Sequence, residues 1–367
     1  MKNIRRLFYF FAVVFFVHLN MYAQTNLTDV EVADGYVFGK GDVRITLDGS
    51  FFRVSNSDEV FFDQSIPGLK QVDFSQDQDY MLISSFDFPE SEENYKIYLF
   101  LFNNDFELVD KAEIEAFYGM PHPLFRVNNQ GVISFVDPLT LRLEIRDGGR
   151  QSSVELEEGL PFEMERQLCI ETDDKGVYVL YNRELIPIEE GNPIFTLARY
   201  DLSSSELTKR EVTISSVTYC GLTEEGLFIS GVKFEESIPV PMSLRLNESL
   251  ELLNETKEIN FERLEKYNDF LVGTFNKTLV VFNEYFEKKS EKYLTGEGKF
   301  KRVFAMDGKL GIMIEEDGML WIYTATSENV EFDTDLPYGI LNFSNFERFV
   351  NIKECYIHSN NQTFIIK

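Results

Sequence analysis

Short β-rich stretches bounded by Gly, Asn, Asp and Pro follow one another along almost the whole chain, and they recur at a regular interval. A polar turn followed by an apolar strand appears six times, at successive steps of about 51, 45, 50, 43 and 40 residues. These copies begin at Asp79, Gln130, Lys175, Glu225, Asn268 and Gly308. A period of ~40 to 50 residues indicates a supersecondary unit that stacks on copies of itself. The repeat therefore restricts the chain to a series of similar sheets that bury one another's faces.

Several of the predicted strands are apolar at successive positions, as in 97–102, 177–181 and 278–282. Strands of this kind have both faces covered, whereas a strand with one face in water alternates apolar and polar residues. A fourth, more polar strand follows in several units, as expected for an outermost strand that faces solvent. The chain is thus expected to be all-β, with sheets packed face to face.

The period and the strand order resemble those of β-propellers, and the resemblance covers nearly the whole chain after residue 23. No motif assigns a subfamily: there is no repeated Gly-His with Trp-Asp, and Trp321 is the single Trp. Six units cover roughly 70–335, the tail 346–367 adds three strands, and 42–62 adds strands without a complete unit of their own. The resemblance implies seven four-stranded blades closed by strands from both termini. Six or eight blades, or two β-sandwich domains divided near 159–166, are the alternatives.

The first 23 residues have the layout of a secretory signal peptide, with basic residues at Lys2, Arg5 and Arg6 and an apolar run over 7–17. Eleven apolar residues are too few for a transmembrane helix, which needs ~20, so a membrane anchor is the weaker reading. We expect a signal peptide at 1–23, an N-terminal segment at 24–41 and a single domain at 42–367. The ending Tyr-Ala-Gln resembles leaders of Bacteroidota-type bacteria. It implies export to the periplasm or the cell exterior.

The charge balance limits the partners and the chemistry. The chain has 35 basic and 62 acidic residues, for a net charge of −27, which disfavours nucleic acid and anionic lipid as partners. Three His and three Cys are too few for His-rich metal centres. Acidic pairs such as Asp173-Asp174 fall at tight turns and are interpreted as structural. No catalytic residue, metal site or cofactor is predicted, and the sequence favours a protein without catalytic activity.

Cys169, Cys220 and Cys355 each lie in a predicted strand just before a turn. The sequence favours buried thiols that pack as small apolar groups. A disulfide between two of them requires neighbouring strands in register, which the sequence does not show.

Three connections within the repeats are long, at 85–95, 182–193 and 233–241, and they are rich in Pro and acidic residues. The connection 117–123 adds aromatic and apolar side chains. Long, stiff loops with apolar tips are where scaffolds carry binding sites. The predicted partner-binding residues are Phe86, Asp87, Phe88, Glu92, Tyr118, Met120, His122 and Phe234.

These features favour an exported protein-binding module or an accessory subunit of an outer-membrane or type 9 secretion complex. The alternative is a carbohydrate-binding protein or a glycoside-active enzyme with a pocket on the propeller axis. Carboxylates or aromatics from three or more blades that converge on a deep axial pocket would favour the alternative.

Overall fold

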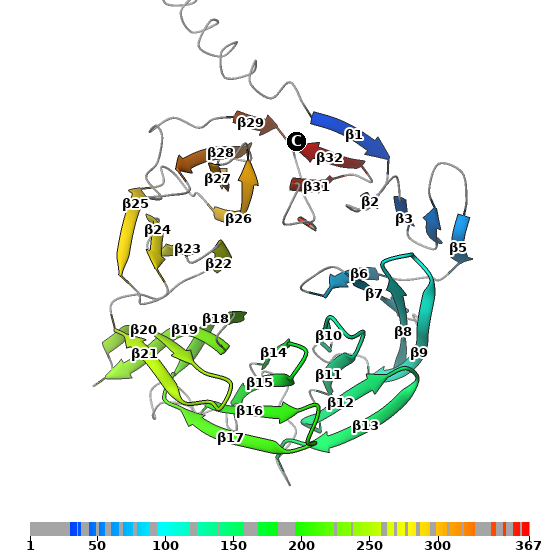
Figure 1. The fold of residues 1–367 in the computed structure, drawn as a ribbon, viewed down its shortest axis with the longest axis horizontal. Helices are drawn as coiled ribbons and strands as arrows, with labels where there is room; N and C mark the ends of the chain where they lie inside the picture. The colour runs from blue at the N-terminus through cyan, green and yellow to red at the C-terminus, as the bar shows by residue number, and fades with distance from the viewer. Residues whose placement is uncertain are drawn as a thin grey trace, which may run out of the picture. The chain divides into compact units, whose positions relative to one another are not determined.

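The computed structural model describes residues 30–366, except for connections between many of the strands, and Figure 1 shows the arrangement of its elements. The larger undescribed connections are 88–93, 118–122, 158–167, 183–194 and 327–338. The predicted signal peptide lies outside the described residues. The regular structure of the described residues is β-strand throughout, in eight four-stranded antiparallel sheets.

The chain divides into two compact units, Lys40–Glu262 and the pair of segments Met1–Gly39 and Arg263–Lys367. Lys40–Glu262 contains four complete sheets. They are β6 (Leu69–Phe74), β7 (Tyr80–Asp87), β8 (Asn94–Asn103) and β9 (Leu108–Phe117); β10 (Phe125–Val127), β11 (Ile133–Asp137), β12 (Arg142–Asp147) and β13 (Arg150–Glu155); β14 (Leu168–Thr172), β15 (Gly176–Asn182), β16 (Phe195–Asp201) and β17 (Leu207–Val212); and β18 (Ser216–Thr223), β19 (Gly226–Glu235), β20 (Ile238–Leu246) and β21 (Leu252–Thr256).

The other unit contains three complete sheets. They are β22 (Arg263–Tyr267), β23 (Phe270–Phe275), β24 (Thr278–Asn283) and β25 (Lys288–Tyr293); β26 (Lys299–Met306), β27 (Lys309–Glu316), β28 (Met319–Thr326) and β29 (Gly339–Asn342); and β1 (Val30–Asp34), β32 (Gln362–Ile366), β31 (Cys355–Ser359) and β30 (Arg348–Phe349). The remaining sheet has the strand order β2 (Tyr36–Val37), β3 (Arg44–Asp48), β4 (Phe51–Ser55) and β5 (Val60–Ser65).

The sheet at the chain ends combines strands from both termini. β1 pairs antiparallel with β32, from Val30 opposite Ile366 to Asp34 opposite Gln362. This confirms that strands from both termini form one sheet, although β1 and β2 lie within 24–41, outside the predicted domain 42–367. The described residues form eight sheets, one of the alternatives, rather than seven. The prediction missed a sheet because the first strand of the β2–β5 sheet has only two residues and gives no periodic signal.

Apolar side chains fill the space between consecutive sheets of Lys40–Glu262. One core cluster joins Val136 and Leu143 on one side of the undescribed connection 158–167 to Ile170 and Val179 on the other. The proposed division into two sandwiches near 159–166 is therefore wrong, because a single core crosses it. A second cluster joins the β14–β17 and β18–β21 sheets, and a third joins β6–β9 to β10–β13. Each large side chain buried in this way contributes ~1.5 to 3 kcal/mol of hydrophobic stabilisation.

A turn with the pattern Asn-x-x-Leu/Phe-Glu connects the third and fourth strands of three sheets. It occurs at 103–107, 247–251 and 283–287. In each copy the Asn Oδ1 accepts a hydrogen bond from the Glu backbone N–H at 2.8–2.9 Å, and its Nδ2 donates to the Glu carboxylate. The fourth residue has a positive φ at Phe106 (62°) and Leu250 (61°). The turn thus fixes where each outer strand begins.

Candidate functional site

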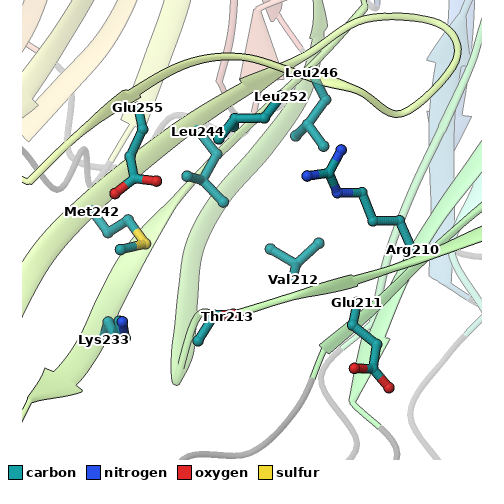
Figure 2. Close-up of a pocket in the computed structure, with 10 residues that line it drawn as sticks. All are labelled: Arg210, Glu211, Val212, Thr213, Lys233, Met242, Leu244, Leu246, Leu252 and Glu255. Atoms are coloured by element: carbon teal, nitrogen blue, oxygen red, sulfur yellow. The ribbon is translucent and has the colours of Figure 1, made fainter.

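An open groove lies between the outer strand β17 of one sheet and the strands β20 and β21 of the next (Figure 2). It encloses about 190 Å³. Its floor consists of the buried side chains of Val212, Met242, Leu244 and Leu246. Arg210, Glu211, Thr213, Lys233, Leu252 and Glu255 line its sides. The groove therefore combines an apolar floor with a rim of both charge signs, which suits a protein segment.

The strand registers explain how the groove is formed. Met242, Leu244 and Leu246 lie on one face of β20, because alternate residues of a strand share a face. Glu255 is opposite Leu244, and Leu252 is opposite Leu246. The pairing slips between Arg245 and Leu246, so that the intervening residue on β21, Leu253, has no partner on β20. This β-bulge changes the direction of the side chains at the start of β21. Leu252 and Leu253 are 42% and 47% exposed there.

The sheets on the two sides of the groove are tied together at one end. The Arg210 Nη1 of β17 donates a hydrogen bond to the Leu250 carbonyl in the turn before β21, at 2.5 Å. Lys233 forms an ion pair with Glu235 at 3.4 Å, and Glu235 also binds Lys257 at 3.3 Å. The carboxylate of Glu235 has a lowered pKa because both lysines bind it. These contacts hold the strands beside the groove in place. A partner that binds there therefore causes little loss of conformational entropy in the propeller.

β21 is the last strand in its sheet, so one of its edges lies outside the described strand pairings. Other outer strands carry charges along their length, such as Lys209-Arg210-Glu211 in β17 and Lys288-Lys289 in β25. β21 begins instead with two exposed leucines. Leu108 and Val109 occupy the same place at the start of β9, where they are 40% and 45% exposed. An edge of this kind can accept an additional strand.

A charged cluster forms where the first strands of three consecutive sheets lie side by side. Arg126 of β10 pairs with Glu171 of β14 at 3.4 Å, and Asp73 of β6 is close enough to influence both charges. Burial lowers the pKa of Arg126, but the attraction of Glu171 and Asp73 outweighs it and raises that pKa above the usual value. Burial raises the pKa of Glu171, which Arg126 only partly offsets. The cluster contains two carboxylates from two sheets, with an arginine that compensates them.

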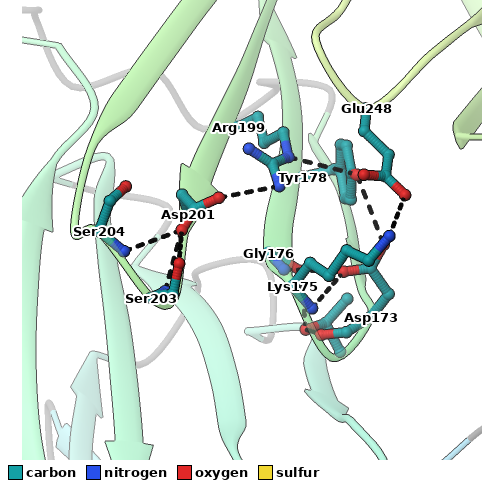
Figure 3. Close-up of polar contacts among 10 residues, drawn as sticks. Asp173, Lys175, Gly176, Tyr178, Arg199, Asp201, Ser203, Ser204 and Glu248 are labelled. Carbon is teal, nitrogen blue, oxygen red and sulfur yellow. Dashed lines mark hydrogen bonds and ion pairs between the residues drawn. The ribbon is translucent and has the colours of Figure 1, made fainter.

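A second polar network joins turns at one end of the β14–β17 sheet (Figure 3). The Asp173 Oδ1 accepts hydrogen bonds from the backbone N–H groups of Lys175 and Gly176 at 2.8 and 2.7 Å. Asp174 Oδ1 accepts one from the Asn129 backbone N–H at 3.0 Å. The Lys175 Nζ pairs with Glu248 of the neighbouring sheet at 2.6 Å. The structural interpretation of the Asp173-Asp174 pair is consistent with these contacts, because both carboxylates bind turn backbone.

Tyr178 and Arg199 extend this network toward the next turn (Figure 3). The Arg199 Nε donates to the Tyr178 hydroxyl at 3.3 Å, and its Nη2 pairs with Asp201 at 3.1 Å. Burial raises the pKa of Tyr178 to about 12. Among the described residues, no group of three or more His, Cys, Asp or Glu side chains is arranged to hold a metal ion.

The structure contradicts part of the predicted partner site. Phe86 is 0% exposed and lies in the core beside Phe125, at 6.4 Å between ring centroids. It cannot contact a partner, because the strand β7 continues through 80–87 and carries Phe86 into the sheet interface. Asp87 ends β7 opposite Lys96. The remaining predicted positions Phe88, Glu92, Tyr118, Met120 and His122 lie outside the described residues.

The predicted long loop at 233–241 is a hairpin. β19 and β20 pair from Lys233 opposite Val240 to Glu235 opposite Ile238, which leaves two connecting residues. Phe234 is half-buried on β19, and its backbone N–H donates to Ser215 Oγ at 3.0 Å. Pro239 and Pro241 favour a loop in the sequence, but both are strand residues in the structure. Both prolines precede the part of β20 that pairs with β21. The backbone N–H that each proline lacks is therefore not needed for pairing with β21.

Comparison with known proteins gives the fold. No protein-family model matches the chain, and no curated protein matches it. Among solved structures, apo AztD from Citrobacter koseri aligns over 86% of this chain and 87% of its own, at 12% identity and a TM-score of 0.50. Dipeptidyl peptidase 4 from Porphyromonas gingivalis aligns over 92% of this chain and 59% of its own, at 8% identity and a TM-score of 0.52.

The fold is a β-propeller. Four-stranded sheets that begin with an inner strand and share cores with their neighbours agree with the structural matches. At 8–12% identity these likenesses extend to the fold alone. In the part of the chain that the structure describes, there is no helix long and apolar enough to cross a membrane.

Proposed function

We propose that this propeller is a protein-binding module and that an extended segment of its partner lies in the groove between β17 and β21. The observation that carries the proposal is the apolar floor of Val212, Met242 and Leu244 beside the exposed Leu252. Apolar side chains of a partner would replace water on this floor, and burial of each would contribute ~1 to 3 kcal/mol. The charged rim would fix the orientation of the segment.

The groove differs from the interface between the β6–β9 and β10–β13 sheets. Between β9 and β12, the ion pair of Asp110 and Arg146 occupies the position next to the outer strand, with side-chain exposures of 9% and 17%. Between β17 and β20, Leu244 and Met242 lie at the base of an open space instead. If the only requirement were to pack neighbouring blades together, an ion pair of this kind could fill both interfaces. This difference supports a binding role for the groove.

The net charge of −27 supports a basic partner segment. Glu211 and Glu255 on the rim would bind its cationic side chains, and the negative field of the whole protein would accelerate encounter. The signal-peptide layout of 1–23 supports export. We therefore place the module in the periplasm or on the cell exterior, as an accessory subunit of an outer-membrane or type 9 secretion complex.

Site-specific photocrosslinking tests the proposal. A photoreactive amino acid at Thr213, an exposed residue of the groove, should crosslink one envelope protein through an extended peptide that mass spectrometry identifies. The same group at Ser152, an exposed residue of the outer strand β13, is the matched control and should not. Leu252→Asp should abolish the crosslink from position 213. Equal crosslinking from both positions, or crosslinking that survives Leu252→Asp, would contradict the proposal.

The charged cluster of Asp73, Arg126 and Glu171 is the observation that favours the alternative, a carbohydrate site on the axis. The pairing of Arg126 with Glu171 explains this cluster as internal charge compensation. Asp73 and Glu171 bring carboxylates from two sheets to this cluster, whereas the alternative predicts carboxylates or aromatic side chains from three or more blades around a deep axial pocket. A screen of soluble glycans by thermal shift, with Arg126→Met as the comparison, distinguishes the two functions.

A further inference from the structure

Two cysteines face each other across the interface between the β14–β17 and β18–β21 sheets. Cys169 lies on β14 and Cys220 on β18, the first strands of their sheets, and these strands contact each other. The Cys169 Sγ is 3.8 Å from the Cys220 carbonyl oxygen. Both side chains are half-buried free thiols that pack against the same core cluster.

The strand registers place both sulfur atoms at this interface. Ile170 packs in the core cluster on the opposite side of β14, so the alternation of the strand turns Cys169 toward β18. On β18 the pairing with β19 shifts between Val217 and Tyr219, and this bulge sets the direction of Tyr219 and Cys220. Cys169 and Cys220 therefore lie on two contacting strands of neighbouring sheets, and both pack in the core cluster between those sheets.

We propose that Cys169 and Cys220 form a disulfide that joins the inner strands of two neighbouring blades when the protein meets a small-molecule disulfide oxidant. One thiolate attacks the oxidant and forms a mixed disulfide, and the first thiol of the oxidant leaves. The second cysteine then attacks the protein sulfur and releases the second thiol. The two cysteines lose two electrons and two protons, and the oxidant is reduced to two thiols. This inference does not depend on the proposed partner groove.

The groups around the two thiols determine the rate of oxidation. The hydrogen bond with Cys169 and the burial of the side chain raise the pKa of the Cys220 thiol, and Glu171 raises it further, whereas Arg126 lowers it. Cys220 is therefore mostly protonated at neutral pH, and thiolate is the reactive form. Oxidation is expected to be slow at pH 7 and faster at pH 8.5. The disulfide would close a loop that contains most of one sheet and should raise Tm by on the order of 5 °C.

The test uses the full chain without its signal peptide, incubated overnight at pH 8 with oxidised glutathione or with dithiothreitol. The samples are then denatured in acid, alkylated and digested. The oxidised sample should contain a crosslinked peptide pair with Cys169 and Cys220, two hydrogen masses lighter than the separate peptides, and should melt at the higher temperature. Cys169→Ser should remove both effects, and Cys355→Ser, the matched control, should keep them.

The crosslinked peptide from the unsubstituted protein shows whether the Cys169–Cys220 disulfide forms, even if a variant does not fold. Free thiols or glutathione adducts at both positions after oxidation would overturn the proposal. A crosslink of either cysteine to Cys355 would overturn it as well, and so would an equal rise in Tm for Cys169→Ser.

Discussion

Arg146 of β12 binds Asp110 of β9 through two parallel hydrogen bonds, from Nε to Oδ2 at 2.5 Å and from Nη2 to Oδ1 at 2.8 Å. The same Nη2 donates to the Lys111 carbonyl at 3.0 Å. The hydrogen bond and the charge of Asp110 raise the pKa of Arg146. This fork joins two neighbouring sheets where their side chains are largely buried, 17% and 9% exposed.

Replacement of Arg146 by Met should lower the free energy of unfolding by ~2 to 4 kcal/mol, because it leaves the carboxylate of Asp110 buried without its partner. Urea titration measures the effect. Lys96→Met is the control, because the Lys96–Glu113 pair at 2.6 Å is half-exposed and should contribute nothing measurable. Equal losses in the two variants would show that burial does not distinguish the pairs.

Asp201 should contribute stability that depends on pH. Hydrogen bonds from the Ser203 hydroxyl and from the Ser203 and Ser204 backbone lower the pKa of its carboxyl group, and Arg199 lowers it further. The folded protein therefore binds this proton less tightly than the unfolded chain, whose Asp has a pKa of ~3.9. The contribution is fully present above that value and is lost as the pH falls through the lower pKa of the folded state.

The expected result for Asp201→Asn is a loss of ~1 kcal/mol at pH 7 that shrinks below pH 4. Chemical denaturation of both proteins between pH 7 and pH 2.5 measures the difference. Ser203→Ala, which removes one donor, should give a smaller difference with the same pH dependence. A loss that stays constant down to pH 2.5 would contradict this account of Asp201.

Leu250 is expected to prefer glycine to alanine as a replacement. It is 2% exposed and packs in the core cluster beneath the turn, but its φ of 61° is in the left-handed region. Leu250→Ala should cost ~2 to 4 kcal/mol through lost packing. Leu250→Gly loses the same packing, but glycine adopts a positive φ without the steric strain that alanine has there. Leu250→Gly should therefore be more stable than Leu250→Ala by ~1 kcal/mol. Thermal melts that rank the two variants in the opposite order would contradict the role assigned to the turn.

The sequence predicted the sheets because each one repeats a turn and an apolar strand at a fixed interval. The sequence also predicted that both faces of the strands 177–181 and 278–282 are covered. Tyr178 and Val281 on these strands are 1% and 0% exposed. The β2–β5 sheet was missed because a strand of two residues, Tyr36–Val37, carries no period.

The groove was harder to predict, because it joins residues of two sheets that are more than 30 positions apart, such as Val212 and Leu244. One local signal was available. An outer strand is expected to be polar, and Leu252-Leu253 breaks this expectation directly after the Asn-x-x-Leu-Glu turn. The prediction relied on loop length instead, which placed Phe86 on the surface although it continues a buried strand.

Leu252 is proposed to anchor a partner segment in the groove. The test is the Kd of the crosslinked partner for Leu252→Asp and for Leu108→Asp, a change at the same place on a different outer strand. Leu252→Asp should weaken binding by ~30-fold or more, as expected for an anchor residue worth ~2 kcal/mol. Leu108→Asp should leave the Kd within about twofold, and both variants should keep the Tm of the parent protein. An unchanged Kd for Leu252→Asp, or an equal loss for Leu108→Asp, would contradict the claim.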